Sequence, residues 1–472
     1  MLFNSIEFLF FFLFLFPLYL FLKHKWQNWV LIIASCVFYA SWSWKFLFLM
    51  CGSITTDYFC AQYISRSNNE TKRRNLLFLS IFVNLSILFF FKYFNFFSEN
   101  ILSLLKFFHL VSPFWDFSVN VILPLGISFY TFEAISYVVD VYRREVQPAK
   151  SYWDYFLFVI YFPHLVAGPI MRAKQFLPQI VTPRTCSWSL FYEGAHLFYW
   201  GLFEKIFIAD NLAKIVNPMF LDAAPSNGMG IWVALYAFAF QIFCDFDGYS
   251  NMARGLGKCM GFEISINFNL PYFSISPREF WQRWHITLSS WFRDYLYIPL
   301  GGNRGGLWKT FRNLLIIMFL AGLWHGSAWH FVLWGLYQGV LLVIYSFIPE
   351  QSKETEEEPK NLWYLLKMFV FFHLTILGWL LFRSQSLGQI GAMLHAVFNG
   401  FYFSKENISL FFEFSAIISP LLIVQLFQFK NKDLMVLYRC HWFLKTVAYM
   451  LMAFLILNFG VMRAEQFIYF QF

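Results

Sequence analysis

Residues 276–339 read SPREFWQRWHITLSSWFRDYLYIPLGGNRGGLWKTFRNLLIIMFLAGLWHGSAWHFVLWGLYQG, and they set His285 and His325 among aromatic and basic residues in a very apolar chain. An ionisable side chain at membrane depth costs free energy, so it usually faces the protein interior or a wet cavity and marks a functional site. His325 is therefore the first candidate for chemistry. The alternative is a histidine that hydrogen-bonds neighbouring helices, because buried polar side chains also stabilise helix pairs in membranes.

A capping box opens this stretch. Ser276 can accept the first free amides of a helix, while Pro277 and Glu279 occupy its first and third positions. The pattern predicts one helix that runs from this cap and lies in the plane of the interface rather than spanning the membrane. Its apolar face carries Trp281, His285, Leu288, Phe292 and Tyr295. Pro299 to Gly302 should end it.

The loop after this helix and the apolar run beyond it place His325. Asn303–Gly306 is either a plain turn or a loop whose backbone amides approach a phosphate. The roughly 13 residues from Arg312 to His325, at about 1.5 Å each in a helix, lift the imidazole about 20 Å into a hydrocarbon core of about 30 Å. We expect a break at Gly322–Gly326 that lets another molecule come close.

Composition bounds the class of protein. The 472 residues are 59% hydrophobic, 23% aromatic and 13% charged, which excludes an ordinary soluble protein and indicates a polytopic membrane protein. The seven cysteines form no CxxC or Cys/His cluster, so we predict neither a metal site nor a disulfide framework. The net charge of +8 sits in short loops, where insertion orientation explains it, so no nucleic-acid partner is implied.

Apolar segments recur along the chain. We expect about 11–12 spanning helices in an all-α protein, with a re-entrant segment at Phe162–Pro169 in addition to the interfacial helix. Basic loops after the first and third spans place the N-terminus outside the cell. The segments outside the central stretch are Ile6–Leu22, Trp26–Ala40, Trp44–Ile64, Leu76–Phe97, Val119–Tyr142, Phe191–Ile208, Ile231–Phe246, Leu362–Phe382, Phe411–Phe429 and Phe443–Val461.

Acidic residues accompany several of these segments. Glu133 and Tyr130 either line a polar cavity or make a hydrogen bond between packed helices. The run from Cys244 to Arg254 contains acids, hydroxyls and an arginine at helical spacing, which indicates a buried ion-pair network that holds the structure. The acidic loop at residues 351–360 separates a motif-bearing core, about 44–349, from C-terminal helices, about 361–472, within a single membrane domain over residues 1–472.

Five segments, taken in order, resemble a known family. ILPLGISFYTFEAISYVVDVYR, FPHLVAGPI, FDGYSNMARG, REFWQRWHITLSSWFRDYLYIPLGG and AGLWHG are similar to motifs of the membrane-bound O-acyltransferase superfamily, in particular its bacterial alginate and peptidoglycan O-acetyltransferases. The likeness is strong from about Trp44 to Gln338 and mainly positional beyond. The resemblance implies a ring of helices around a central funnel in the bacterial inner membrane, with no bound cofactor.

The resemblance also implies the reaction. Members of this branch move an acyl group from a cytosolic thioester donor, acetyl-CoA or an acylated carrier protein, towards an extracytoplasmic polysaccharide such as an alginate-like polymer or peptidoglycan. The family's catalytic histidine corresponds to His325, which would act as general base. His285 corresponds to a second important residue that would orient the donor or stabilise developing charge. D-alanyl or other acyl transfer to a different envelope polymer is the alternative within the family.

Further site residues complete the expectation. Residues expected to contact substrate are Trp281, Trp284, Arg283, Arg293, Asn303, Arg304 and Trp324. Because the external loops are short, the acyl group should pass to an extracytoplasmic partner, a serine-hydrolase-like transferase in similar systems. The C-terminus resembles an acyl-carrying tail, which implies Tyr469 as a phenolic acyl relay; the alternative is an aromatic anchor in the interface. A transporter or channel, and a non-catalytic scaffold, are the competing classes.

Overall fold

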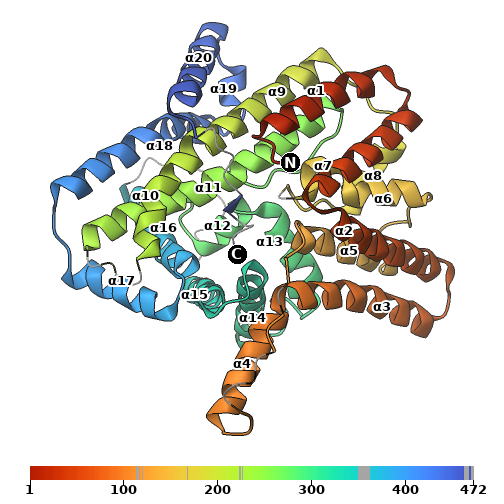
Figure 1. The fold of residues 1–472 in the computed structure, drawn as a ribbon, viewed down its shortest axis with the longest axis horizontal. Helices are drawn as coiled ribbons and strands as arrows, with labels where there is room; N and C mark the ends of the chain where they lie inside the picture. Colours follow the sequence, from red (N-terminus) through yellow and green to blue (C-terminus); the bar gives the residue numbers. More distant parts are fainter. Residues whose placement is uncertain are drawn as a thin grey trace. The chain divides into compact units, whose positions relative to one another are not determined.

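The computed structural model describes residues 1–112, 115, 117–119, 121–166, 168–222, 225, 227–348, 362–461 and 467–468. All regular structure in these residues is helical, and none of them forms a strand (Figure 1). The chain divides into two compact units. The first comprises Met1–Gly194, Leu256–Ser265 and Gly326–Ala328, and the second comprises Ala195–Gly255, Ile266–His325 and the described part of the chain from Trp329 onward.

The first unit is built on two long apolar helices, α2 and α3. Helix α2 kinks at Ser43, whose backbone leaves the helical region, so the two predicted segments Trp26–Ala40 and Trp44–Ile64 are two helical stretches that meet at this kink. Helices α5 and α6 pack against α2, and α5 also packs against α3. The elements are α1 (Ile6–Phe21), α2 (His24–Arg66), α3 (Glu70–Leu88), η1 (Phe89–Tyr93), α4 (Phe94–Phe107), α5 (Ile127–Tyr142), α6 (Tyr152–Ile160), α7 (Phe162–Leu165) and α8 (Ala173–Val181).

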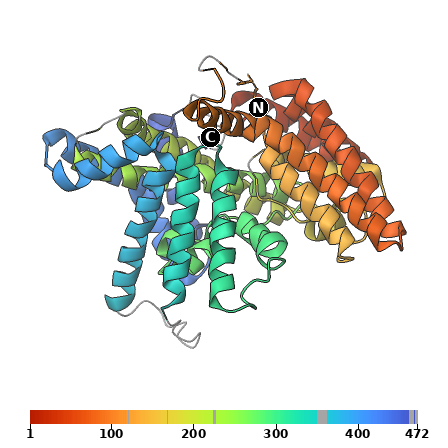
Figure 2. The ribbon, with the colours of Figure 1, turned by 90° about the horizontal axis from the view of Figure 1, so that it is seen from below.

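The second unit carries the central stretch. Helices α14, α15 and α16 stand side by side in it, and α12 packs against α15 (Figure 2). Helices α9 (Trp188–Phe203) and α11 (Gly228–Cys259) belong to both units. The others are η2 (Glu204–Ala209), α10 (Asp210–Leu221), η3 (Pro271–Phe273), α12 (Pro277–Arg283), α13 (Ile286–Phe292), η4 (Arg293–Tyr297), α14 (Leu307–His325), α15 (Trp329–Ser346), α16 (Leu362–Arg383), α17 (Leu387–Asn399), α18 (Lys405–Asn431), α19 (Val436–Arg439) and α20 (Trp442–Phe459).

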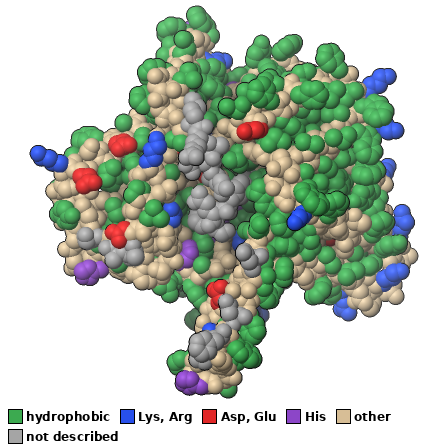
Figure 3. Space-filling view, viewed as in Figure 1, with side chains coloured by type: hydrophobic (Ala, Val, Ile, Leu, Met, Phe, Trp, Pro, Cys, Tyr) green, Lys and Arg blue, Asp and Glu red, His purple; other side chains and the backbone are tan. Residues whose placement is uncertain are grey.

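Eight helices of the described residues are long and apolar enough to cross a membrane. They carry many exposed large apolar side chains, as a protein in contact with lipid requires (Figure 3). The chain is a multi-pass membrane protein. The expected number of spans, 11–12, is larger than eight for two reasons. Some predicted spans form helices shorter than a full crossing, such as Ile6–Phe21 with 16 residues. Others, such as Val119–Tyr142, are helical over only part of their length, here from Ile127.

Glycines explain how closely α14 and α15 pack. A Cβ atom at Gly322 would lie 2.3 Å from the carbonyl oxygen of Phe331, and one at Gly335 would lie 2.2 Å from that of Met318. Both contacts are with backbone, so neither position can accept a side chain without moving a helix. Gly322 therefore serves helix packing, and α14 continues unbroken to His325, so the break expected from Gly322 onward begins only after the histidine.

A carboxylate inside the first unit ties α5 to the chain around α7. Glu133 is 2% exposed, and its two oxygens lie 2.8 Å from the backbone nitrogen of Met171 and 3.4 Å from Nε2 of His164. Of the two interpretations left open for Glu133, these contacts match the one in which it joins packed segments. The predicted re-entrant segment is a single turn of helix, α7, followed by irregular backbone.

Candidate active site

The central stretch folds as two short helices with His285 between them. Ser276 caps α12 as predicted, because its Oγ accepts the backbone N–H of Glu279, while the Glu279 carboxylate accepts that of Ile275. The prediction of one continuous interfacial helix is wrong. Helix α12 ends at Arg283, and His285 adopts a left-handed conformation with φ of 43° before α13 begins at Ile286.

Asn267 explains why the helix breaks there. Its backbone carbonyl accepts the N–H of Ile286 at 2.9 Å, and its side-chain oxygen accepts both the hydroxyl and the backbone N–H of Thr287, at 2.8 and 3.3 Å. These bonds replace the helical bonds that the start of α13 lacks, and they come from a residue 18 positions before His285. A left-handed conformation in a non-glycine residue costs free energy, so it persists only where surrounding contacts hold it.

The same asparagine fixes the tautomer of His285. Nδ1 of His285 lies 3.2 Å from Oδ1 of Asn267. Because Thr287 donates to that same atom through a backbone N–H, the atom is an acceptor and Nδ1 must carry the proton. Burial lowers the pKa of His285 to about 3, so its ring is neutral at physiological pH. Nε2 therefore presents a lone pair, which suits it to receive a hydrogen bond rather than to stabilise a negative charge.

His325 ends α14 inside an enclosure of aromatic rings. His325 is 3% exposed. The ring centroids of Trp324 and Trp334 each lie 4.9 Å from the centroid of the imidazole, and the ring centroid of Phe382 lies 5.3 Å from it. The Trp324 ring also lies 6.0 Å from His285. Both predicted histidines therefore lie next to the Trp324 ring, although 40 residues separate them along the chain.

The predicted substrate-binding residues fall into two groups. Trp281, Trp284 and Trp324 lie in this aromatic cluster, with Trp281 5.9 Å from Trp334 and Trp284 4.9 Å from Trp379. The polar group lies at the surface of the unit: Arg283 pairs with Glu279 at 2.9 Å, Arg293 pairs with Asp294 at 2.8 Å, and Asn303 and Arg304 are exposed in the loop before α14. Substrate binding by either group stays a prediction.

A buried lysine that sequence reasoning missed organises the acidic run of α11. Nζ of Lys205 lies 2.8 Å from Asp210 and 2.7 Å from Asp245, and all three side chains are 4% exposed. The predicted network therefore exists, and a second cation, in η2, joins the one in the run itself. Arg254 donates to Asn251 at 3.0 Å and interacts electrostatically with Asp247.

The described part of the C-terminal tail lies against this network. The backbone N–H of Ile468 donates to Asp245 at 2.7 Å, and Phe467 packs on Phe246 with 5.4 Å between centroids. Phe246 in turn meets the edge of His285 at 4.6 Å. Phe467 is 1% exposed, so it is buried in protein rather than in an interfacial belt. Tyr469, the predicted relay, lies outside the described residues.

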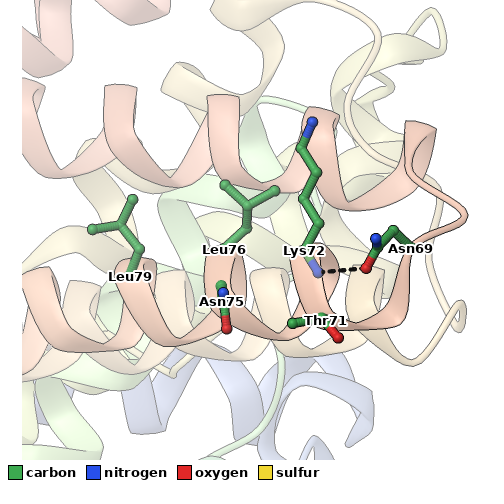
Figure 4. A pocket seen from close by; sticks show the side chains of 6 residues that line it. All are labelled: Asn69, Thr71, Lys72, Asn75, Leu76 and Leu79. Atoms are coloured by element: carbon green, nitrogen blue, oxygen red, sulfur yellow. Dashed lines mark hydrogen bonds between the residues drawn. The ribbon is translucent and has the colours of Figure 1, made fainter.

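Two hollows are found among the described residues, and neither is lined by a candidate histidine. A cavity of about 30 Å³ in the second unit has room for about one water, and the polar residues that line it include Glu204, Asp247, Asn251 and Arg254. In the first unit, an open groove of about 400 Å³ follows the start of α3, where Asn69 caps the helix by accepting the N–H of Lys72 (Figure 4). Neither is lined by His285 or His325, so neither holds the candidate chemistry.

Comparisons with known proteins find similarity over the part of the chain that carries both histidines. The model of MBOAT, the membrane-bound O-acyltransferase family, matches residues 83–375, a range that includes both histidines and the enclosing tryptophans. The prediction of a single domain over residues 1–472 is not tested by this match.

Three relatives illustrate the range of similarity. A probable alginate O-acetylase AlgI of Azotobacter vinelandii is 41% identical over 401 residues, which cover 84% of this chain and 78% of that protein. A peptidoglycan O-acetyltransferase of Helicobacter pylori is 34% identical over 384 residues, covering 76% and 71%. A teichoic acid D-alanyltransferase of Bacillus subtilis is 30% identical over 288 residues, covering 56% and 70%.

Proposed function

This chain belongs to the membrane-bound O-acyltransferase family, and from that premise we propose that it moves an acetyl group from cytosolic acetyl-CoA across the membrane for O-acetylation of an extracytoplasmic polysaccharide. Its family makes it an O-acyltransferase, so transport and scaffolding no longer compete as classes. The acetyl group and an alginate-like acceptor follow from the names of its most similar relatives above. Peptidoglycan and D-alanyl transfer remain second to alginate-like acetylation because those relatives are less similar.

The main observation in support of this proposal is the burial of His325 among aromatic rings. A single imidazole at the end of a span, surrounded by rings, offers a dry site in which a base and a reacting carbonyl can meet without competing water. In the reaction, the acceptor oxygen attacks the thioester carbonyl carbon while its proton passes to His325. The tetrahedral intermediate then expels the thiolate, which takes that proton from the His325 imidazolium.

His285 has a different task in this scheme. Its Nδ1–H is committed to Asn267, and its Nε2 lone pair can accept a hydrogen bond from an amide N–H group of the donor. Orientation of the donor is thus favoured over the alternative of charge stabilisation. The N-terminus lies outside the cell in this scheme, and Arg304, in the loop before α14, faces the phosphates of the donor from the cytosol.

The acetyl group then leaves through the C-terminal tail. The described part of the tail supports this route, because Phe467 packs on Phe246, whose ring contacts His285, and the N–H of Ile468 donates to Asp245. Tyr469 receives the acetyl group as a phenolic ester and passes it to an extracytoplasmic serine-hydrolase-like partner. A phenolic ester keeps much of the transfer potential of a thioester, so neither step is steeply uphill.

Purified protein in liposomes with labelled acetyl-CoA tests the proposal. His325→Ala should lower the rate of acetyl transfer about 10²–10⁴-fold, while His395→Ala, which changes an exposed histidine of α17, should leave it unchanged. Near-normal transfer by folded His325→Ala protein would refute the assignment. An acetylated carrier protein offered in place of acetyl-CoA decides between the two donor classes.

The same assay separates the relay from its alternative. Tyr469→Phe keeps an aromatic side chain in the tail but removes the nucleophilic oxygen, so acetyl-CoA should still bind while label no longer reaches the partner or polymer. If the Tyr469→Phe variant acetylates polymer at the normal rate, the acceptor hydroxyl belongs to the partner itself. Transfer to polymer by the isolated chain would remove the need for a partner.

A further inference from the structure

Three tryptophans of the second unit share an uncommon feature. The indole Nε1 atoms of Trp281, Trp334 and Trp379 are buried, and none of them donates a hydrogen bond to another described residue. Trp334 is 1% and Trp379 2% exposed, so lipid and bulk water do not reach them. All three belong to the cluster around His325, where Trp334 lies 5.9 Å from Trp281 and 6.2 Å from Trp379.

Such donors are costly unless something accepts from them. A buried polar group without a partner costs about 1–3 kcal/mol, and more than about nine in ten buried polar groups in native proteins have one. Phenylalanine would fill most of the same space with no donor to satisfy. Trp334 is the one of the three whose ring is seen against that of His325, so its orphaned N–H indicates that an acceptor atom is brought to this place by a substrate.

Trp334 is the member of the cluster with direct contact to the candidate base. Its ring lies 4.9 Å from that of His325 at an interplanar angle of 90°, and α15 holds it there through the close crossing with α14 at Gly322 and Gly335. That crossing leaves little freedom for α15 to move relative to α14. The donor on Trp334 is thus fixed relative to the imidazole before any substrate arrives, which is what preorganised electrostatic stabilisation requires.

We propose that the indole N–H of Trp334 donates to the carbonyl oxygen of the acyl donor and stabilises the oxyanion that forms on it. This inference rests on the proposed function. The acceptor oxygen bonds to the carbonyl carbon, its proton goes to His325, and the carbonyl electron pair moves to the oxygen that faces Trp334. When the carbon–sulfur bond breaks, the pair returns to form the carbonyl, and the thiolate takes the proton from the imidazolium.

Neutral donors suit this place. A lysine or arginine would bring a charge whose desolvation costs several kcal/mol in so apolar a surrounding, whereas an indole N–H is a donor only and carries no charge. Trp379 stacks almost parallel on Trp334, at 16°, and lies one ring further from His325. It provides a matched control, because the same substitution there removes the same kind of atom at a position one ring away from the imidazole.

The kinetic test compares Trp334→Phe with Trp379→Phe in the liposome assay. Removing one oxyanion donor lowers kcat about 10²–10³-fold in a characterised hydrolase, so we expect at least about a 10²-fold loss for Trp334→Phe with KM almost unchanged. Trp379→Phe should stay within about fivefold of the parent. Each substitution removes an unsatisfied donor and a similar part of a buried ring, so the two variants should lose similar stability, and an unfolding curve of each in detergent checks that both fold. A Trp334→Phe variant as active as Trp379→Phe overturns the inference.

A spectroscopic readout does not depend on turnover. In protein labelled with ¹⁵N-tryptophan, the indole signal that disappears in Trp334→Phe belongs to this residue. Saturation with the ketone analogue of acetyl-CoA, in which a methylene replaces the thioester sulfur, should move that signal downfield and leave the Trp379 signal nearly in place. No shift at saturation overturns the inference. Wild-type protein that transfers no acetyl group refutes the proposed function instead, and wild-type activity with a normal Trp334→Phe variant refutes the inference alone.

Discussion

Removal of the Lys205 charge should destabilise the second unit strongly. Lys205 contacts Asp210 and Asp245 at 2.8 and 2.7 Å, and all three side chains are 4% exposed. Lys205→Met keeps most of the volume but leaves two carboxylates buried without their cation. Breaking a buried ion pair by removing one partner costs about 3–5 kcal/mol, and we expect a loss of stability at least in that range because two acids share this lysine.

Lys258 supplies the matched control. It also lies between two carboxylates, Glu193 at 2.8 Å and Glu263 at 3.6 Å, but it is 17% exposed and Glu263 is 67% exposed. Solvent screens such a pair, so Lys258→Met should cost no more than about 1 kcal/mol. Denaturant unfolding in detergent, followed by tryptophan fluorescence, measures both variants. Equal losses for the two would show that burial of Lys205 adds nothing and would refute the reasoning.

The remaining predictions concern His285 and the helix crossing. Burial lowers the pKa of His285 from 6.5 to about 3, so below pH 6.5 the unfolded chain binds a proton that the folded protein does not. Relative to His285→Gln, the parent protein should therefore lose about 1.4 kcal/mol of stability for each pH unit by which the pH falls between about pH 6 and 3. If the unfolding free energies of the two proteins change equally with pH in that window, the pKa of His285 is not lowered. Gly335→Ala places a Cβ atom 2.2 Å from a backbone oxygen and should cost about 1–3 kcal/mol. Gly391→Ala, with open space around it, should cost nothing in the same unfolding assay.

Local patterns in the sequence predicted the elements that local interactions determine. The cap at Ser276 depends on three neighbouring residues, and it forms where the pattern places it. The helix that ends at His325 follows from an uninterrupted apolar run, and α14 extends over it. The ordered motifs indicated the family because they preserve spacing along the chain, which a family match over residues 83–375 confirms.

The break at His285 shows why the rest was not predictable. The periodicity of residues 277–295 is that of one helix, and no glycine or internal proline marks an interruption near His285. Asn267, which lies before the cap, supplies the hydrogen bonds that make the broken form stable. Propensity describes what a segment does alone, and here a tertiary contact outweighs it.

Lys205 and the C-terminal tail make the same point over longer distances. Lys205 lies 40 residues before Asp245, and Ile468 lies 223 residues after it, yet all three meet at one carboxylate. Asp245 uses one oxygen for the lysine and the other for the tail. Because Phe246 follows it and touches both Phe467 and His285, the network that neutralises this acid also fixes the tail at the edge of the candidate site. A charge pattern that looks purely structural in sequence thus also determines where Phe467 and Ile468 lie, next to a ring that contacts His285.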